Sequence, residues 1–334
     1  MSLMRFNFNY VKTTITTAIA IAVMPAAAAQ AFSFSDYNLV VFEDVYSNSE
    51  VEGNAFIGGN LNGNSSNYCI KCSAGGDFTP FDGNGLKVVG DINGTPKNVN
   101  NGANVEYGGN LNAHINTNGG GTVTQNSDLA SEFDALEKFL QDTSLGLAGL
   151  ESNSGVVIPG QQPGAVRFNS SGAETAIFNI DVSQLFGNKT QQIELNLNGS
   201  ETAIINVSGT SANWNQGNMV GSLVDDATQQ KVIWNFYEAE NLQFNNALYG
   251  SLLAPLAHLT NQTELEGNIV VKSLQQNGEV HLPTFTGELP VFVPRPEEPE
   301  TDPVSVPEPA TILGLMTVLG FGAVLKRNRG QLTQ

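Results

Sequence analysis

The chain has 334 residues, of which 40% are hydrophobic and 14% are charged, and it carries 14 basic against 32 acidic side chains. Its formal net charge of -18 at pH 7 excludes nucleic acids and anionic lipid surfaces as targets and favours divalent cations or basic partners. The length allows one or two domains, including a single large β-domain.

Residues 1–31 have the pattern of a secretory signal peptide. Arg5 and Lys12 supply a basic start, residues 13–23 form an apolar run, and small residues follow. Two A-x-A sites predict cleavage after Ala29 or Ala31. Because the apolar run is too short to span a bilayer, the sequence predicts an exported protein rather than an N-terminal membrane anchor.

A short pattern centred on glycine recurs along the mature chain. Residues 51–62, VEGNAFIGGNLN, alternate apolar or glycine positions with mostly polar ones, which is typical of a half-buried strand. The core of the pattern returns at 88–92, 107–111, 248–252 and 265–269. The residue after the glycine is always small and polar: Asn60, Asp91, Asn110, Ser251 or Asn268.

Glycine and asparagine can adopt the left-handed conformations of tight corners, and a strand repeated with such corners suits stacked rungs. The pattern therefore predicts an all-β fold of the β-solenoid (β-helix) type. A β-sandwich with glycines at bulges is the alternative, since the spacing of the repeats is irregular.

Cys69 and Cys72 are the two cysteines of the chain, and they lie in the turn-rich segment 60–76. In an exported protein this spacing favours a small disulfide-closed loop, with two free thiols as the alternative. A zinc site is disfavoured, because no second cysteine pair or nearby histidine supplies the remaining ligands. A redox role is disfavoured because no helix N-terminus is expected there to lower a thiol pKa.

In residues 127–150 the two-residue alternation gives way to apolar side chains at helical spacing, with Ser127 as the expected N-cap. The helical positions are Leu129, Phe133, Leu136, Phe139 and Leu140. One amphipathic helix in an all-β chain is expected to pack along a sheet and cover its apolar surface. Binding of a partner through this helix is the alternative.

Beyond residue 164 the alternation of strands resumes. Val232, Trp234 and Phe236 share one face of a bulky strand, where they are expected in the core rather than in a platform for sugar rings. Residues 248–290 then read as two more rungs and a closing turn. The whole β-domain is expected to cover residues 32–290.

Few residues have the spacing of a catalytic site. His114, His258 and His281 have no adjacent motif partner, and His281 is expected to form hydrogen bonds in the closing turn. Carboxylates are paired at Glu43 with Asp44, Asp225 with Asp226, and Glu238 with Glu240. Only Glu238 and Glu240 could share one strand face, as glycoside cleavage would need, and a solvated acidic surface is favoured. The sequence thus predicts no enzyme, no catalytic residues and no required cofactor, although calcium held by Asp, Asn and backbone oxygens is more credible than catalysis.

The C-terminal part divides into a linker and an apolar segment. Residues 291–309 are rich in proline and acidic residues, which is typical of an extended spacer. Residues 310–325 carry no charge and precede Lys326, Arg327 and Arg329. This order predicts a membrane-associated helix with its basic C-terminus inside.

The tail resembles a PEP-CTERM sorting signal on the basis of Pro307-Glu308-Pro309, the apolar segment and the basic cluster. This resemblance implies a Gram-negative bacterium, an exosortase-type sorting enzyme as a partner, and a tail of residues 310–334 that holds the protein at the membrane, at least transiently. It also implies a final location at the cell surface or in an exopolysaccharide matrix.

Residues 32–290 are similar to the choice-of-anchor A family. The segments that carry the resemblance are 37–42, 51–62, 232–236, 250–255, 278–281 and 285–290. The resemblance implies a β-solenoid with a flanking helix, similar to ice-binding solenoids, and an adhesive role without assigned catalytic residues.

Three functions are thus open. The favoured one is a non-enzymatic surface or matrix adhesin that binds polysaccharide or another protein. The second is a polysaccharide-active enzyme on a β-solenoid, and the third is ice binding, which needs regularly spaced threonines such as Thr122 and Thr124.

Overall fold

The computed structural model describes residues 32–73 and 78–290. The expected signal peptide (1–31), linker (291–309) and sorting tail (310–334), with Pro307, Glu308 and Pro309, lie outside the described residues. The buried hydrophobic residues of the described part run from Phe34 to Phe285. Because this part has its own core, we expect it to fold by itself.

Within the described residues the strands form three sheets. The largest contains β1 (Leu39–Val41), β2 (Val45–Ser47), β4 (Ala55–Ile57), β5 (Leu61–Gly63), β7 (Asn84–Val88), β9 (Asn104–Tyr107), β11 (Val123–Gln125), β14 (Thr175–Asp181), β16 (Thr202–Ser208), β17 (Ser211–Trp214), β19 (Val232–Asn235), β20 (Asn241–Phe244), β21 (Ser251–Asn261) and β23 (Ile269–Gln276). The second contains β3 (Glu50–Val51), β6 (Ser66–Tyr68), β8 (Lys97–Val99), β10 (Ile115–Thr117), β22 (Leu265–Glu266) and β24 (Val280–His281). The third contains β12 (Gly155–Val157), β13 (Gly164–Asn169), β15 (Thr190–Asn196) and β18 (Asn218–Val220).

Four helical segments complete the described part: α1 (Leu129–Ala148), α2 (Val182–Leu185), the 3-10 helix η1 (Gly221–Val224) and α3 (Asp226–Gln229). β12 runs antiparallel to β13, whereas the other paired strands of the described residues run parallel. The predicted all-β class with one long flanking helix is confirmed.

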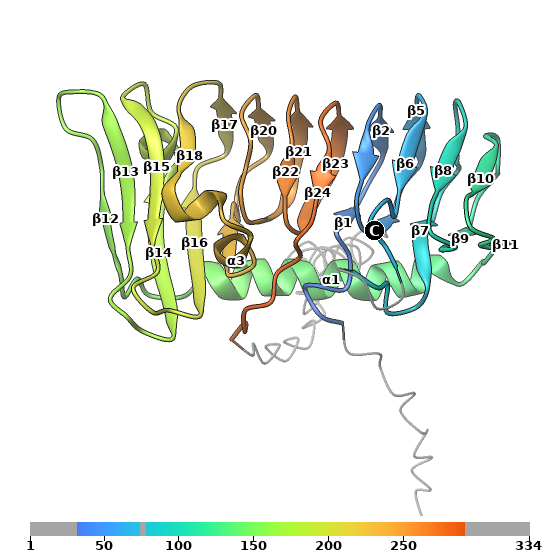
Figure 1. Ribbon diagram of the computed structural model, residues 1–334, viewed down its shortest axis with the longest axis horizontal. Helices are drawn as coiled ribbons and strands as arrows, with labels where there is room; N and C mark the ends of the chain where they lie inside the picture. The colour runs from blue at the N-terminus through green and yellow to red at the C-terminus, as the bar shows by residue number, and fades with distance from the viewer. Residues whose placement is uncertain (1–31, 74–77, 291–334) are drawn as a thin grey trace, which may run out of the picture. The chain divides into compact units, whose positions relative to one another are not determined.

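The strands are ordered differently in space and in sequence. β1, β4, β7, β9 and β11 stack outward one after another, and α1 then runs back along the row of strands (Figure 1). β14, β16, β19, β21 and β23 stack in the return direction. Leu39 of β1 pairs with Ile269 of β23, so the first and last parts of the domain meet inside the sheet.

The predicted single strand over residues 51–62 is wrong. This segment contains three short strands, β3, β4 and β5, separated by corners at Gly53-Asn54 and Gly58 to Asn60. A chain that turns twice within twelve residues still alternates inward and outward side chains, so the period alone could not reveal the corners.

Glycine occupies the corner after β4 because neighbouring turns of chain approach closely there. Gly59, Gly90 and Gly109 stack, with Gly90 N–H bonded to Gly59 O at 3.0 Å and Gly109 N–H to Gly90 O at 3.1 Å. A Cβ on Gly90 would lie 2.6 Å from Gly59 O. The column therefore excludes any side chain.

The same sequence pattern also builds a second, different corner. Gly250 and Gly267 have φ values of 101°, which glycine adopts without strain. The hydroxyl of Ser251 donates to Asn268 Oδ1, and the Asn268 amide donates to Tyr37 O at 2.6 Å. The small polar residues after these two glycines thus form hydrogen bonds at the corners. Buried backbone groups there would otherwise have no partner.

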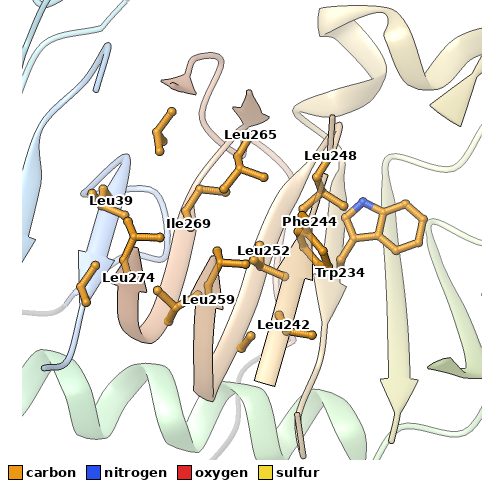
Figure 2. Packing of buried hydrophobic residues seen from close by; sticks show 14 of the residues in the cluster. Leu39, Trp234, Leu242, Phe244, Leu248, Leu252, Leu259, Leu265, Ile269 and Leu274 are labelled. Carbon is orange, nitrogen blue, oxygen red and sulfur yellow. The ribbon is translucent and has the colours of Figure 1, made fainter. Parts of the chain in front are cut away.

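The interior between the sheets is filled by inward-facing apolar residues from successive strands, including Leu39, Ile269, Leu252 and Trp234 (Figure 2). Val232, Trp234 and Phe236 are fully buried, which confirms their predicted place in the core. The Trp234 indole N–H donates to Tyr249 O at 2.9 Å, so its polar atom is satisfied inside the core.

The helix expected over 127–150 is α1, and it covers the outer side chains of β1, β4, β16, β19, β21 and β23. Its N-cap is Asp128 rather than the predicted Ser127. Phe139, predicted to belong to its apolar face, is only partly buried and packs against Phe32. Ser144, fully buried, donates to Asn235 Oδ1 at 2.6 Å and fixes the C-terminal half of α1 on β19.

Lys87 anchors the N-terminal half of α1. It is 3% exposed, and its ammonium contacts Glu132 of α1 at 2.6 Å and Asp82 at 2.9 Å. Burial lowers the pKa of Lys87, but the hydrogen bonds with Glu132 and Asp82 outweigh it and leave this pKa raised. The residue therefore stays charged and pairs the helix with the sheet.

Candidate functional site

One part of the largest sheet has an outer surface that α1 does not cover. It is formed by β17, β20, residues 258–261 of β21, residues 273–276 of β23, β2 and β5, which lie side by side in Figure 1. We call this surface the amide face, because amides predominate among its outward side chains.

The outward side chains of the amide face lie in register. One row, the central row, contains Asn213, Gln243, Thr260, Gln275, Tyr46, Asn62, Asn93 and Asn112. A second, the flanking row, contains Ser211, Asn241, His258, Ser273, Asp44, Asn60, Asp91 and Asn110. Neighbouring strands of a sheet are about 4.8 Å apart, so each row offers polar groups at a regular spacing.

Alternation of buried and exposed residues produces these rows. Ala212, Leu242, Leu259, Leu274 and Val45 are the inward neighbours of the central row, and all are buried. The residues on either side of them must then face solvent. The amide face is therefore a direct result of the two-residue period of its strands.

Hydrogen bonds between side chains hold one half of the face in place. The Asn112 amide donates to Asn93 Oδ1 at 2.8 Å, and the Asn93 amide donates to Asn62 Oδ1 at 3.0 Å. In the flanking row Asn60 donates to Asp44 Oδ1 at 3.0 Å. Such ladders reduce the side-chain freedom that a ligand would otherwise have to remove on binding.

A shallow hollow lies near the middle of the amide face. Its volume is about 780 Å³, and its lining includes Asp44, Tyr46, Asn62, Ser273 and Gln275. Tyr46 is 46% exposed, so much of its ring is open to solvent. Amides, a carboxylate and an aromatic ring together suit a polar ligand that also has apolar ring faces.

A second hollow of about 720 Å³ lies between α1 and the sheet. Its lining includes Glu43, Glu137, Glu240, His258 and Lys272. Burial raises the pKa of Glu137, and the nearby carboxylates of Asp134 and Glu43 add to this effect. Lys272 lies 3.5 Å from Glu43, so one of the carboxylates in this groove has a cationic partner.

Of the carboxylate pairs singled out in the sequence, Glu43 and Asp44 both line the first hollow, whereas Glu238 and Glu240 do not share a cleft. Glu240 lines the second hollow, whereas Glu238 accepts a hydrogen bond from Gly209 N–H at 2.5 Å. The two lie in a turn after β19, not on a strand, so the strand face that they could have shared is absent. Asp225 and Asp226 are exposed at the start of α3, where they complement the helix N-terminus.

The predicted cysteine loop and threonine pair lie apart from the amide face. Cys69 and Cys72 are joined by a disulfide with a Cα–Cα distance of 4.8 Å. Thr122 and Thr124 are exposed at and next to β11, the last strand of the row. In the described residues no group of three or more His, Cys, Asp or Glu side chains is arranged to hold a metal ion.

The three histidines have separate environments. His114 is exposed before β10, and His258 shares a hydrogen bond with Ser273 in the flanking row. His281 of β24 lies among carboxylates: its ring nitrogens contact Glu266 at 2.9 Å and Glu279 at 2.7 Å, and Glu52 lies 4.0 Å away. The hydrogen bond with Glu266, opposed by burial and helped by Glu279, raises the pKa of His281 to about 9.

The His281 cluster predicts a pH-dependent stability. An unfolded histidine titrates near 6.5, so the contribution of His281 is complete below that pH and is lost as pH rises toward about 9. The full difference in pKa would correspond to about 3.4 kcal/mol, and solvent screening reduces it to about 1–2 kcal/mol.

Thermal unfolding of the wild type and of His281→Gln across pH 6–9 measures this contribution. The unfolding temperature of the wild type should exceed that of the variant at pH 6, and the difference should disappear as pH rises through this window. His258→Gln, which removes an exposed histidine, is the control and should leave the profile unchanged. A wild-type advantage that is independent of pH would contradict this assignment.

Comparison with known families shows to which family the chain belongs. Residues 32–282 match the profile of a family described as a putative ice-binding-like adhesive domain. This chain belongs to that family. The match to this adhesive domain covers the row of strands, α1 and both strands of the junction at β1 and β23. Neither the curated proteins nor the solved structures contain a match to the chain.

Membership in the adhesive-domain family supports an adhesin-like, non-enzymatic role and a surface or extracellular location. Among the described residues, no helix combines the length and apolar character needed to cross a bilayer. Sequence reasoning did not identify the amide face, because its central row draws on strands far apart in the chain. The available signal was the run of Asn and Gln at alternating positions, as in Asn241 and Gln243.

Proposed function

We propose that this protein is an exported adhesin that binds polysaccharide through the amide face without cleaving it. The observation that carries this proposal is the central row, in which amide, hydroxyl and tyrosine side chains follow one another in register. A polysaccharide presents hydroxyl groups at regular intervals, and amides can both donate to and accept from them.

Tyr46 adds an apolar contact to this polar row. Its exposed ring lines the hollow beside Gln275 and Asn62, where the face of a sugar ring could stack while its hydroxyls bond to the amides. A row of mixed amides also differs from the regularly spaced threonines that ice binding needs, because Thr260 is the threonine of the central row.

The stacking of short strands in this fold supports an extended binding surface. The three sheets are built from short strands joined at glycine and asparagine corners, with each turn of chain hydrogen-bonded to the next. These features support the proposal that the domain is a β-solenoid of stacked rungs, in which every rung would add one position to each row. A long ligand could then be bound along several rungs at once, and many weak contacts would add up.

The segments outside the described residues complete the proposal. The signal peptide would direct export, and the PEP-CTERM-like tail, with Pro307, Glu308 and Pro309, would be processed by an exosortase-type enzyme at the membrane of a Gram-negative bacterium. The domain would then reside at the cell surface or in the extracellular matrix, as a choice-of-anchor A protein. A matrix protein is the alternative ligand.

Binding of residues 32–290 to a panel of bacterial surface polysaccharides and matrix proteins, with and without calcium, tests this function. Saturable binding to a polysaccharide whose chain length stays unchanged is the expected result. Shortened glycans would instead point to an enzyme and to the groove at Glu43, Glu137 and Glu240. Binding to matrix proteins alone would exclude polysaccharide as the ligand, and calcium-dependent binding would identify a metal requirement.

A further inference from the structure

The row of strands ends at β10 and β11, and both strands have an unpaired outer edge among the described residues. β11 pairs with β9 on one side, and β10 pairs with β8 on one side. Both strands are three residues long. Unpaired backbone N–H and C=O groups on a sheet edge are a template for pairing with another strand.

This end also exposes side chains whose partners on the neighbouring strands point into the interior of the domain. Val123 of β11 is in register with the buried Val105 and Leu86, yet it is 39% exposed, as is Leu111. Ile115 of β10 is partly buried and packs against the same core. The apolar interior of the domain is therefore open to solvent at β10 and β11.

At the opposite end of the row, the outer edge of β14 is capped. β12 runs antiparallel to β13 there. The adjacent Asn153 satisfies the outer edge of β14: its backbone N–H donates to Ile177 O at 3.1 Å, and its side chain accepts from Ile177 N–H at 2.8 Å. The edge of β14 is thus capped, although β12 keeps an outer edge that pairs with no other strand of the described residues.

The uncapped end also lacks the charges with which natural proteins protect edge strands. Residues 107–127 contain no Asp, Glu, Lys or Arg, although the whole chain has a formal net charge of -18. Two copies of so acidic a protein repel each other over most of their surfaces. Residues 107–127 of two copies could meet without bringing carboxylates together, and the next acidic residue in the chain is the exposed Asp128 before α1.

We propose that two copies of this chain dimerise end to end through β10 and β11. A partner that pairs both edges at once must present two strand edges at the same separation, which a second copy of this end provides. A twofold axis would place β10 of each copy antiparallel to β11 of the other, giving an isologous interface that closes at the dimer. Val123, Leu111 and Ile115 would then be covered.

Sedimentation velocity of residues 32–290 and of the full chain at micromolar concentrations tests this proposal. The wild type should sediment as a dimer, and Val123→Lys should be a monomer with an unchanged circular dichroism spectrum, because the new charge would be buried at the interface. Thr117→Lys in β10 is a second disrupting variant, needed if Val123→Lys fails to fold.

Val157→Lys is the matched control, because Val157 is a 53% exposed valine of β12 at the opposite end. It should remain a dimer. A monomeric wild type, or a dimer that only Val157→Lys disrupts, would overturn the proposal. So would a full chain that stays monomeric while residues 32–290 dimerise, since another segment of the same chain would then cover this end.

Discussion

Replacing Gly90 with alanine is expected to lower the free energy of unfolding by about 2–4 kcal/mol. The new Cβ would lie 2.6 Å from Gly59 O and 2.6 Å from Asn60 Oδ1. Gly109 packs on the other side of Gly90, so the corner cannot relax in either direction without moving a second turn of chain. The hydrogen bonds that join Gly59, Gly90 and Gly109 would lengthen together.

Gly160→Ala is the matched control for this prediction. A Cβ on Gly160 meets no atom within 4 Å, so the same chemical change should alter stability little or raise it slightly by restricting the unfolded chain. Urea unfolding of both variants measures the difference. Equal stability of Gly90→Ala and Gly160→Ala would show that the glycine column does not hold neighbouring turns together.

The glycine pattern shows which parts of the fold could be predicted from the sequence. Glycine followed by a small polar residue indicated stacked turns of chain, and the buried strands and α1 follow the predicted periodicities. The same pattern, however, serves two corners, one at Gly59, Gly90 and Gly109 and the other at Gly250 and Gly267. Local sequence could not separate them, because the difference lies in which neighbouring turn each glycine touches.

The order of the strands in space could not be read from the sequence either. β1 pairs with β23, more than two hundred residues later in the chain, and that pairing depends on α1 returning the chain to the opposite end of the row. Nothing in residues 129–148 indicates the direction of this return. Periodicity describes which face of an element is buried, whereas its neighbours are chosen by packing of the whole domain.

The candidate site was hidden for the same reason. Tyr46, Gln275 and Thr260 become neighbours only when β2, β23 and β21 align. The sequence drew attention instead to Glu238 and Glu240, which are close in the chain but have different surroundings in the fold. Proximity in sequence is a poor guide to a surface whose rows run across the strands.

Replacing Tyr46 with alanine is expected to weaken polysaccharide binding by at least about tenfold, equivalent to about 1.4 kcal/mol or more. The ring lies in the central row between Gln275 and Asn62 and lines the hollow of the amide face. Its removal deletes the one aromatic surface in that row. The free energy of unfolding should change little, because almost half of the side chain is already solvent-exposed.

The most direct test of polysaccharide binding by the amide face compares the affinities of Tyr46→Ala and Phe81→Ala for the same glycan. Phe81 is 45% exposed, close to the 46% of Tyr46, but it packs beside Tyr37, away from the amide face. We predict that calorimetric titration shows a loss of about tenfold or more for Tyr46→Ala and wild-type affinity for Phe81→Ala. Equal affinities for the two folded variants would contradict binding at the amide face.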